Sequence, residues 1–260
     1  MTILDKIVER KRVEVSEAQA KVSIEELSEY PLFSRTCYSL KESVIDPQRT
    51  GIISEYKRAS PSKGVINNIN TVSEVVKGYQ NAGASAISVL TDADFFQGSL
   101  KDLEEARSVL TIPLLRKEFI IDKYQIAEAK AYGADIILLI AACLTNEEVS
   151  ELSNYAKTLG LNVLLEVHNE EELKGNLFDT VDAIGVNNRN LKDFSVSLAH
   201  SYDLVNKIPD TYIKVSESGI SDPQTIRELK SIGYNSFLIG ENFMKTTDPG
   251  KALLEFVKEI

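Results

Sequence analysis

Short segments rich in valine, isoleucine and leucine alternate along the chain with longer segments in which apolar residues recur every three or four positions. The short segments predict buried strands. Several are apolar on both faces, which is typical of strands covered by helices on one side and packed on the other. The strands are predicted at residues 51–57, 86–91, 112–117, 135–141, 162–167, 182–187, 212–216 and 236–240.

The longer segments predict amphipathic helices, and some of their ends carry capping signals. Thr71 with Glu74, and Thr145 with Glu148, have the spacing of a capping box. Pro223 falls in the first turn of another predicted helix, where proline is well tolerated. Further helices are predicted at 100–110, 122–132, 198–208 and 249–260, and before the first strand at about 3–15 and 23–29.

Each predicted strand is followed by a predicted helix, and eight such units match a closed (β/α)8 TIM barrel. An open doubly wound sheet is the alternative, and the lack of a G-x-G-x-x-G sequence after the first strand disfavours it. We therefore expect one barrel domain over residues 1–260. Its first part, residues 1–48, is a helical extension that either caps the bottom of the barrel or lies over its top.

Composition narrows the class of protein. The chain has 260 residues, 43% of them hydrophobic, and a net charge of −10, which offers nucleic acid no overall attraction. No apolar run approaches the length of about 18 residues that spans a membrane. Cys37 and Cys143 are not at metal-site spacing, which indicates a reduced compartment. We expect a cytoplasmic monomer that binds neither nucleic acid nor membrane.

Charged side chains gather at the predicted carboxyl ends of the strands, where a parallel barrel forms its site. Glu55 and Lys57 are two residues apart and so share one face of the first strand. One such charge alone is usually solvated, but lysines and glutamates that meet at one mouth shift each other's pKa and suit acid–base chemistry on a small molecule. The polar residues at these ends are Glu55, Lys57, Ser60, Lys117, Glu118, Glu166, Asn187, Asn188, Arg189, Glu217, Ser218 and Glu241.

Two small-residue turns follow the seventh and eighth strands, at Ser218-Gly219-Ile220 and Gly240-Glu241-Asn242. Backbone N–H groups at these two loops bind phosphate in many barrels, and glycine allows a close approach. The turns therefore predict a phosphate site, with two ordinary strand-to-helix turns as the alternative.

Other polar residues give weaker signals. His168 and His200 have no partner at ligand spacing, and we interpret both as structural. Cys143 lies in an apolar run and is interpreted as a small buried residue rather than a nucleophile. No metal site and no Ser-His-Asp set is predicted.

Five motifs occur in order along the chain: Glu55-Tyr56-Lys57-Arg58-Ala59-Ser60-Pro61-Ser62-Lys63-Gly64, Leu115-Arg116-Lys117-Glu118-Phe119-Ile120, Leu165-Glu166-Val167-His168, Gly185-Val186-Asn187-Asn188-Arg189-Asn190-Leu191 and Ser216-Glu217-Ser218-Gly219-Ile220. Together with the N-terminal Ile3-Leu4-Asp5-Lys6-Ile7 segment, they resemble the indole-3-glycerol phosphate synthase family of tryptophan biosynthesis. Glu118 departs from the aspartate usual in that family, and we expect it to face away from Lys117.

The resemblance implies a lyase that closes a ring in 1-(2-carboxyphenylamino)-1-deoxyribulose 5-phosphate, expels CO2 and eliminates water, without cofactor or metal. Lys117 would polarise the ketone. Lys57 and Glu166 are the candidates for the acid and base of dehydration, and the sequence leaves open which lysine acts at which step. Glu55 would keep Lys57 charged, and Asn187 would hydrogen-bond the substrate or help hold Glu166.

The same resemblance implies the substrate contacts. Ser60, Phe119 and Arg189 would touch the substrate, with Phe119 against the anthranilate ring. The phosphate would be held by Ser218, which also counts among the catalytic residues, and by Gly219, Gly240 and Glu241, the last through its backbone N–H. The N-terminal helices would lie over the barrel top, so that removing residues 1–47 leaves a folded barrel with a strongly raised KM.

Three alternatives stay open. Phosphoribosylanthranilate isomerase would want a cysteine after the first strand and an aspartate after the sixth, where this chain has Glu55, Lys57 and Asn187. A Schiff-base aldolase could use Lys117 as a nucleophile. A barrel that binds its ligand without turnover is the third.

Overall fold

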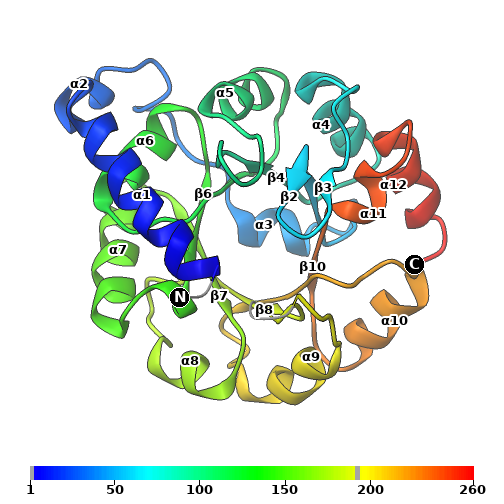
Figure 1. The fold of residues 1–260 in the computed structure, drawn as a ribbon. Helices are drawn as coiled ribbons and strands as arrows, with labels where there is room; N and C mark the ends of the chain where they lie inside the picture. Colours follow the sequence, from blue (N-terminus) through cyan, green and yellow to red (C-terminus); the bar gives the residue numbers. More distant parts are fainter. Residues whose placement is uncertain (1–2, 191–193) are drawn as a thin grey trace.

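Eight parallel strands close into a barrel in the order β1-β10-β9-β8-β7-β6-β5-β4 (Figure 1). The computed structural model describes residues 3–190 and 194–260. The TIM barrel predicted from the sequence is confirmed, and each predicted strand is present with slightly different ends. The barrel strands are β1 (Ile52–Tyr56), β4 (Ala86–Leu90), β5 (Leu114–Lys117), β6 (Ile136–Ile140), β7 (Asn162–Val167), β8 (Ala183–Asn187), β9 (Ile213–Glu217) and β10 (Ser236–Ile239).

Helices surround the barrel in Figure 1, and the capping boxes predicted at Thr71 and Thr145 are formed. The predicted helix at 198–208 is an α-helix continued by a 3₁₀ turn, η2 (Val205–Lys207). The helices after the first strand are α4 (Val72–Asn81), α5 (Leu100–Val109), α6 (Lys123–Ala131), α7 (Asn146–Thr158), α8 (Glu170–Gly175), α9 (Ala199–Leu204), α10 (Pro223–Ser231), α11 (Glu241–Met244) and α12 (Pro249–Val257), with a 3₁₀ turn η1 (Ala141–Cys143) after β6.

Period-two alternation sorts the strand side chains into two apolar layers. In β1, Ile52 and Tyr56 pack in the layer between strands and helices, whereas Ile53 packs in the layer inside the barrel. The next inward position after Ile53 is Glu55. The inward positions therefore change from apolar to charged toward the carboxyl ends of the strands, and this change creates a polar mouth on an apolar floor.

The first strand is followed by a small antiparallel hairpin, β2 (Ala59–Ser60) and β3 (Gly64–Val65), where the sequence predicts only a polar loop. The hairpin positions the Ser60–Gly64 turn at the rim of the barrel. No helix of residues 3–190 and 194–260 is both long and apolar enough to span a membrane.

The N-terminal extension covers both ends of the barrel. Helix α1 (Ile3–Gln19) crosses the ring of helices beside α6 and α7 in Figure 1, and α2 (Ile24–Ser28) packs on α6. Helix α3 (Leu40–Ile45), which the sequence does not predict, inserts the fully buried Leu40 into the apolar layer inside the barrel. The backbone N–H of Leu40 donates to Asn162 at the start of β7, so α3 lies at the bottom. The expectation that the extension lies over the top is correct for α1 and wrong for α3.

A buried lysine fastens α1 to the barrel. Lys11 is 2% exposed, and its Nζ lies 2.7 Å from Asp92 Oδ2, 3.1 Å from Glu118 Oε1 and 2.6 Å from Glu14 Oε2. Glu118 also accepts a hydrogen bond from Thr91 Oγ1 at 2.9 Å. Glu118 therefore turns toward α1 and away from Lys117, as predicted.

Candidate active site

A cavity opens at the carboxyl ends of the strands and under the N-terminal turns of α1. One part of the wall is apolar and includes Leu90, Phe96, Phe119, Leu138 and Ile140, closed from above by Ile3, Leu4 and Ile7. The polar part of the wall comprises Glu55, Lys57, Ser60, Ser62, Lys117, Glu166, Asn187, Arg189, Glu217, Ser218 and Glu241.

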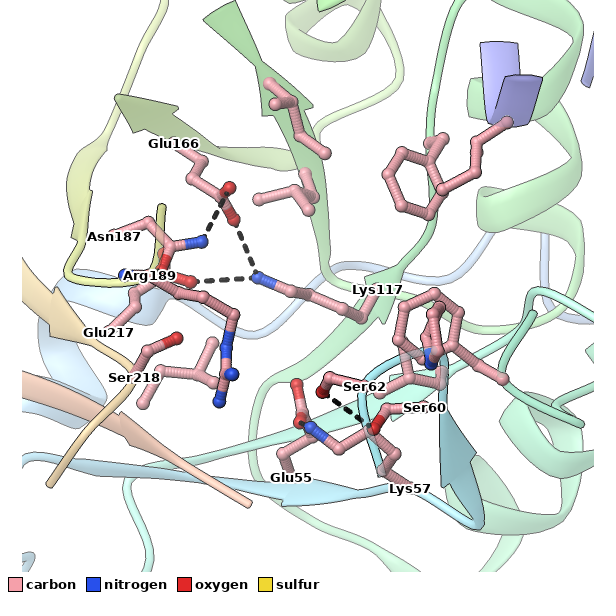
Figure 2. A pocket seen from close by; sticks show the side chains of 18 of the residues that line it. Glu55, Lys57, Ser60, Ser62, Lys117, Glu166, Asn187, Arg189, Glu217 and Ser218 are labelled. Carbon is pink, nitrogen blue, oxygen red and sulfur yellow. Dashed lines mark hydrogen bonds and ion pairs between the residues drawn. The ribbon is translucent and has the colours of Figure 1, made fainter. Parts of the chain in front are cut away.

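Lys117 lies at the centre of the polar wall. Figure 2 shows its side chain reaching from β5 across the barrel to two carboxylates on the far strands. Its Nζ is 3.1 Å from Glu166 Oε2 on β7 and 2.9 Å from Glu217 Oε2 on β9. One ammonium group thus serves two buried carboxylates.

Because one ammonium group faces two carboxylates, the pKa values of Lys117, Glu166 and Glu217 are all shifted. Burial acts to lower the pKa of Lys117, but Glu217 and Glu166 outweigh burial, so the pKa is raised and the ammonium stays charged. Burial acts to raise the pKa of Glu166, but Lys117 and His168 outweigh it, so that pKa is lowered. Burial raises the pKa of Glu217 to about 7, and the charge of Glu166 acts in the same direction against Lys117.

A second ion pair lies at the end of β1. Lys57 Nζ is 2.6 Å from Glu55 Oε1, and both side chains line the cavity (Figure 2). Gly240 makes room for this pair, because a Cβ atom at that position would lie 2.5 Å from Glu55 Oε1. From the sequence we expect Gly240 to allow a phosphate to approach. The structure shows that Gly240 also makes room for Glu55.

Asn187 on β8 holds the other oxygen of Glu166. Its Nδ2 donates to Glu166 Oε1 at 2.9 Å, and its Oδ1 accepts from the backbone N–H of Arg189 at 3.0 Å. The predicted contact between Asn187 and Glu166 is therefore present. The neighbouring Gly185 leaves space for Glu217, since a Cβ atom there would lie 2.1 Å from Glu217 Oε1.

The three predicted substrate contacts all line the cavity, at separate places on its wall. Phe119 belongs to the apolar part, with its ring centroid 6.1 Å from that of Phe96. Ser60 lies on the hairpin after β1. Arg189 Nη2 lies 3.8 Å from Glu241 Oε2, beside the loops after β9 and β10.

Those two loops line a second hollow that shares Glu55, Lys57 and Arg189 with the main cavity. Ser218 and Gly219 both have left-handed backbone conformations, with φ of 68° and 78°. This turn directs the loop after β9 around the hollow. The predicted phosphate residues and the cationic side chains beside them are Ser218, Gly219, Gly240, Glu241, Lys63, Arg189 and Lys245.

The structure brings in two residues to which the sequence assigns no role in the site. Glu217 ends the seventh strand and faces inward, as does Val215 two residues earlier. The sequence pattern can therefore predict where Glu217 lies, but it cannot predict that Glu217 pairs with Lys117. His168, interpreted as structural, has its Nε2 at 3.5 Å from Glu166 Oε1 and its Nδ1 at 3.3 Å from Glu172 Oε2. His168 therefore has two carboxylate partners, both close to it in the sequence, that the search for ligand spacing did not consider.

Cys143 and the possibility of a metal site remain to be placed relative to the cavity. Cys143 is largely buried against the apolar layer inside the barrel, and burial raises the pKa of its thiol to about 12, which agrees with a packing role. No group of histidine, cysteine, aspartate and glutamate side chains suited to a metal ion occurs within the described residues. Leu191, which ends one of the five motifs, lies outside them.

Comparison with known proteins points to one family. The sequence model of the indole-3-glycerol phosphate synthase family matches residues 4–256. A protein of that name from Bacteroides thetaiotaomicron is 46% identical over 258 residues, covering 99% of this chain and 98% of the relative. Another, from Polynucleobacter asymbioticus, is 43% identical over 261 residues, covering 97% and 98%.

Solved structures with lower identity share the architecture. The chain is similar to 3-hexulose-6-phosphate synthase from Salmonella typhimurium, with a TM-score of 0.63 and 11% identity over 80% of this chain and 97% of that one. It is also similar to the tryptophan synthase complex from Pyrococcus furiosus, with a TM-score of 0.59 and 18% identity over 82% and 98%. At these identities the likeness shows the fold alone.

Proposed function

This chain belongs to the indole-3-glycerol phosphate synthase family, and we propose that its barrel cavity converts 1-(2-carboxyphenylamino)-1-deoxyribulose 5-phosphate to indole-3-glycerol phosphate, CO2 and water. The observation that carries this proposal is the convergence of Lys117 with Glu166 and Glu217 in a cavity that also contains the Lys57–Glu55 pair. Family membership gives the reaction, and the geometry supports the assignment of the steps.

In the first step Lys117 acts as the general acid. The aromatic carbon that carries the carboxylate attacks the ketone carbon, and the ketone oxygen takes a proton from the ammonium and becomes a hydroxyl group. The two carboxylates keep the ammonium charged and aimed into the cavity before the reaction, so little reorganisation is needed when charge develops on the oxygen. Loss of CO2 then restores the aromatic ring.

In the second step water leaves. Lys57 gives a proton to the hydroxyl group formed in the first step, and Glu166 removes a proton from the methylene carbon next to nitrogen, so that the new double bond completes the indole. Glu166 suits the role of base because its lowered pKa keeps it ionised. Glu55 suits the support of Lys57 because it lies 2.6 Å from its Nζ.

The walls of the cavity support one orientation of the substrate. The anthranilate ring would lie against Phe119 and the apolar wall, and the phosphate would occupy the second hollow near Ser218, Gly219 and the backbone N–H of Glu241. Arg189 and Ser60 would contact the part of the substrate between its ring and its phosphate. In this orientation the ketone of the substrate would lie between Lys57 and Lys117.

The raised pKa of Lys117 argues against a Schiff-base aldolase. A lysine nucleophile must be neutral to attack a carbonyl, and two carboxylates within 3.1 Å hold this amine in its charged form. Treatment with borohydride and the carbonyl substrate separates the two mechanisms, because only the aldolase would leave a covalent adduct.

The direct test is the appearance of indole fluorescence from the carboxyphenylamino substrate. The chain has no tryptophan, so the background is low. Turnover supports the proposal, whereas binding of substrate without turnover would identify a barrel that has kept only its ligand site.

We further propose a single-domain monomer in the cytoplasm, with the N-terminal extension as part of the barrel domain. Burial of Leu40 in the layer inside the barrel supports the single domain. Size-exclusion chromatography with light scattering tests the oligomeric state, and one cooperative unfolding transition would support a single domain.

A further inference from the structure

His168 directly follows β7 and lies next to Glu166, two residues earlier in the chain. Glu166 lines the cavity, whereas His168 is not among the residues that line it. Its Nε2 is buried, has no hydrogen-bond partner among the residues that the structure describes, and lies 3.5 Å from Glu166 Oε1. This is the distance of an ion pair when the imidazole is protonated, and it gives His168 access to Glu166 without contact with substrate.

The other side of the imidazole is held by α8. Glu172 Oε2 lies 3.3 Å from His168 Nδ1 and accepts a hydrogen bond from the backbone N–H of His168 at 2.8 Å. Glu172 Oε1 accepts from Asn169 Nδ2 at 2.7 Å, so the carboxylate is fixed at both oxygens. A carboxylate fixed in this way holds the ring in place and favours its doubly protonated form.

The carboxylates around the ring act in one direction. Glu172 from α8, Glu166 from β7 and Glu217 from β9 all favour the imidazolium against the cost of burial, and the pKa of His168 is raised. Lys117 from β5, which contacts the other oxygen of Glu166, is a positive charge that acts in the opposite direction. The thiol of Cys143, in the turn after β6, is neutral because burial raises its pKa to about 12. Lys117 faces two carboxylates, those of Glu166 and Glu217, and a positively charged His168 would offset the extra negative charge.

We propose that His168 is a positioning residue which, as an imidazolium held by Glu172, keeps Glu166 ionised and oriented toward Lys117. The inference rests on the proposed role of Glu166 as the catalytic base. Asn187 and His168 then hold Oε1 of Glu166 from two sides while Oε2 faces the ammonium.

The kinetic test compares His168→Asn with wild type from below pH 4.5 up to pH 9, because the lowered pKa of Glu166 puts its protonation in wild type below pH 4.5. Without the imidazolium, Glu166 needs a higher pH to ionise, so we expect the acidic limb of the kcat profile to move up by about one unit. We expect kcat at neutral pH to fall about tenfold with KM changed less than about twofold. Glu172→Gln should move the limb in the same direction by a smaller amount.

His200→Asn is the matched control, since it removes the other histidine of the chain, which lies on α9 and does not line the cavity. We expect this variant to keep the wild-type kcat profile. If His168→Asn lowered only the melting temperature and left kcat and its acidic limb unchanged, the role would be structural and the proposal would be overturned.

Nuclear magnetic resonance gives a readout that does not depend on activity. Two histidines give two sets of imidazole signals, and His200→Asn assigns them. We expect the pKa of His168 to lie above the ordinary value of about 6.5 and to fall in Glu172→Gln. A value at or below the ordinary one would overturn the proposal.

Glu166→Gln distinguishes failure of this inference from failure of the proposed function. If Glu166→Gln retained wild-type turnover, the assignment of the base would fail and the inference with it. If Glu166→Gln were inactive while His168→Asn matched wild type at every pH, only the inference would fail.

Discussion

Glu217 competes with Glu166 for the ammonium of Lys117, at 2.9 Å and 3.1 Å respectively. The competition gives two chemically identical side chains different properties. Glu166 has two further partners, whereas Oε1 of Glu217 is buried without a hydrogen bond to any described residue. At the scale of the residue, the neighbours of each carboxylate decide which one stays ionised near neutral pH.

Replacing Lys117 tests the general acid. We expect Lys117→Met to lower kcat by about 10² or more, because the methionine can neither donate a proton nor polarise the ketone. Binding of inorganic phosphate, followed by calorimetry, should survive, since the second hollow does not include Lys117. A variant near the wild-type rate would remove Lys117 from the mechanism.

Glu217→Gln tests the raised pKa through stability. The folded state keeps a proton on Glu217 up to about pH 7, whereas the unfolded chain releases it near 4.5, so rising pH favours unfolding over this interval. The Glu217→Gln variant has no carboxyl group at this position and does not lose stability in this way as pH rises. From pH 4.5 to 8 its unfolding free energy should therefore rise relative to wild type by about 3 kcal/mol in total. Urea unfolding at several pH values measures this, and a constant difference would contradict it.

Helix α1 shows how one element depends on a few charges. Its apolar residues Ile3, Leu4 and Ile7 close the cavity, but Lys11 makes the buried ion pairs with Asp92 and Glu118 that join the helix to the loops after β4 and β5. Glu118 directly follows Lys117 in the chain. The same loop therefore carries the proposed acid and the anchor of the element that covers it.

Removing that anchor should loosen the cover. Lys11→Met removes the cation that pairs with the buried carboxylates of Asp92 and Glu118, a change that costs about 3–5 kcal/mol at a buried pair. We expect α1 to detach more often, so KM should rise severalfold and limited proteolysis should cut within α1 sooner. Lys6→Met, at an exposed position of the same helix, is the control. Equal proteolysis of both variants would show that Lys11 does not hold the helix.

A truncation that removes the whole N-terminal extension removes helices from both ends of the barrel. Removing residues 1–47 takes away α1, and with it α3 and the buried Leu40. The expected folded barrel with raised KM is therefore better tested by removing α1 alone, which leaves the bottom of the barrel closed.

At the scale of the whole molecule, the two ends of the barrel have different tasks. The bottom and middle are filled by apolar side chains, and the top contains most of the buried charges that face inward. Packing at the bottom contributes stability without touching substrate, whereas the charged top gives up part of that stability to hold groups in reactive states.

Leu40→Ala tests this division. Its side chain is fully buried, so we expect a loss of about 2–5 kcal/mol of unfolding free energy and a fall in melting temperature of about 5–15 °C. At a temperature where the variant is folded, kcat should stay within about twofold of wild type. Ile45→Ala on the same helix, 66% exposed, should change neither quantity. A large loss of kcat in folded Leu40→Ala would show that the two ends are coupled.

The sequence alone determined the eight strands, most of the helices, and the inward direction of Glu55, Lys57, Lys117, Glu166 and Asn187, because hydrophobic period and side-chain alternation are local properties of the chain. Tertiary structure alone decided which charges meet. Lys117 and Glu217 are 100 residues apart, and only closure of the barrel brings their strands to opposite sides of one small space. The same holds for α1 at one end of the barrel with α3 at the other, because the places of these helices depend on how all eight strands close and pack together.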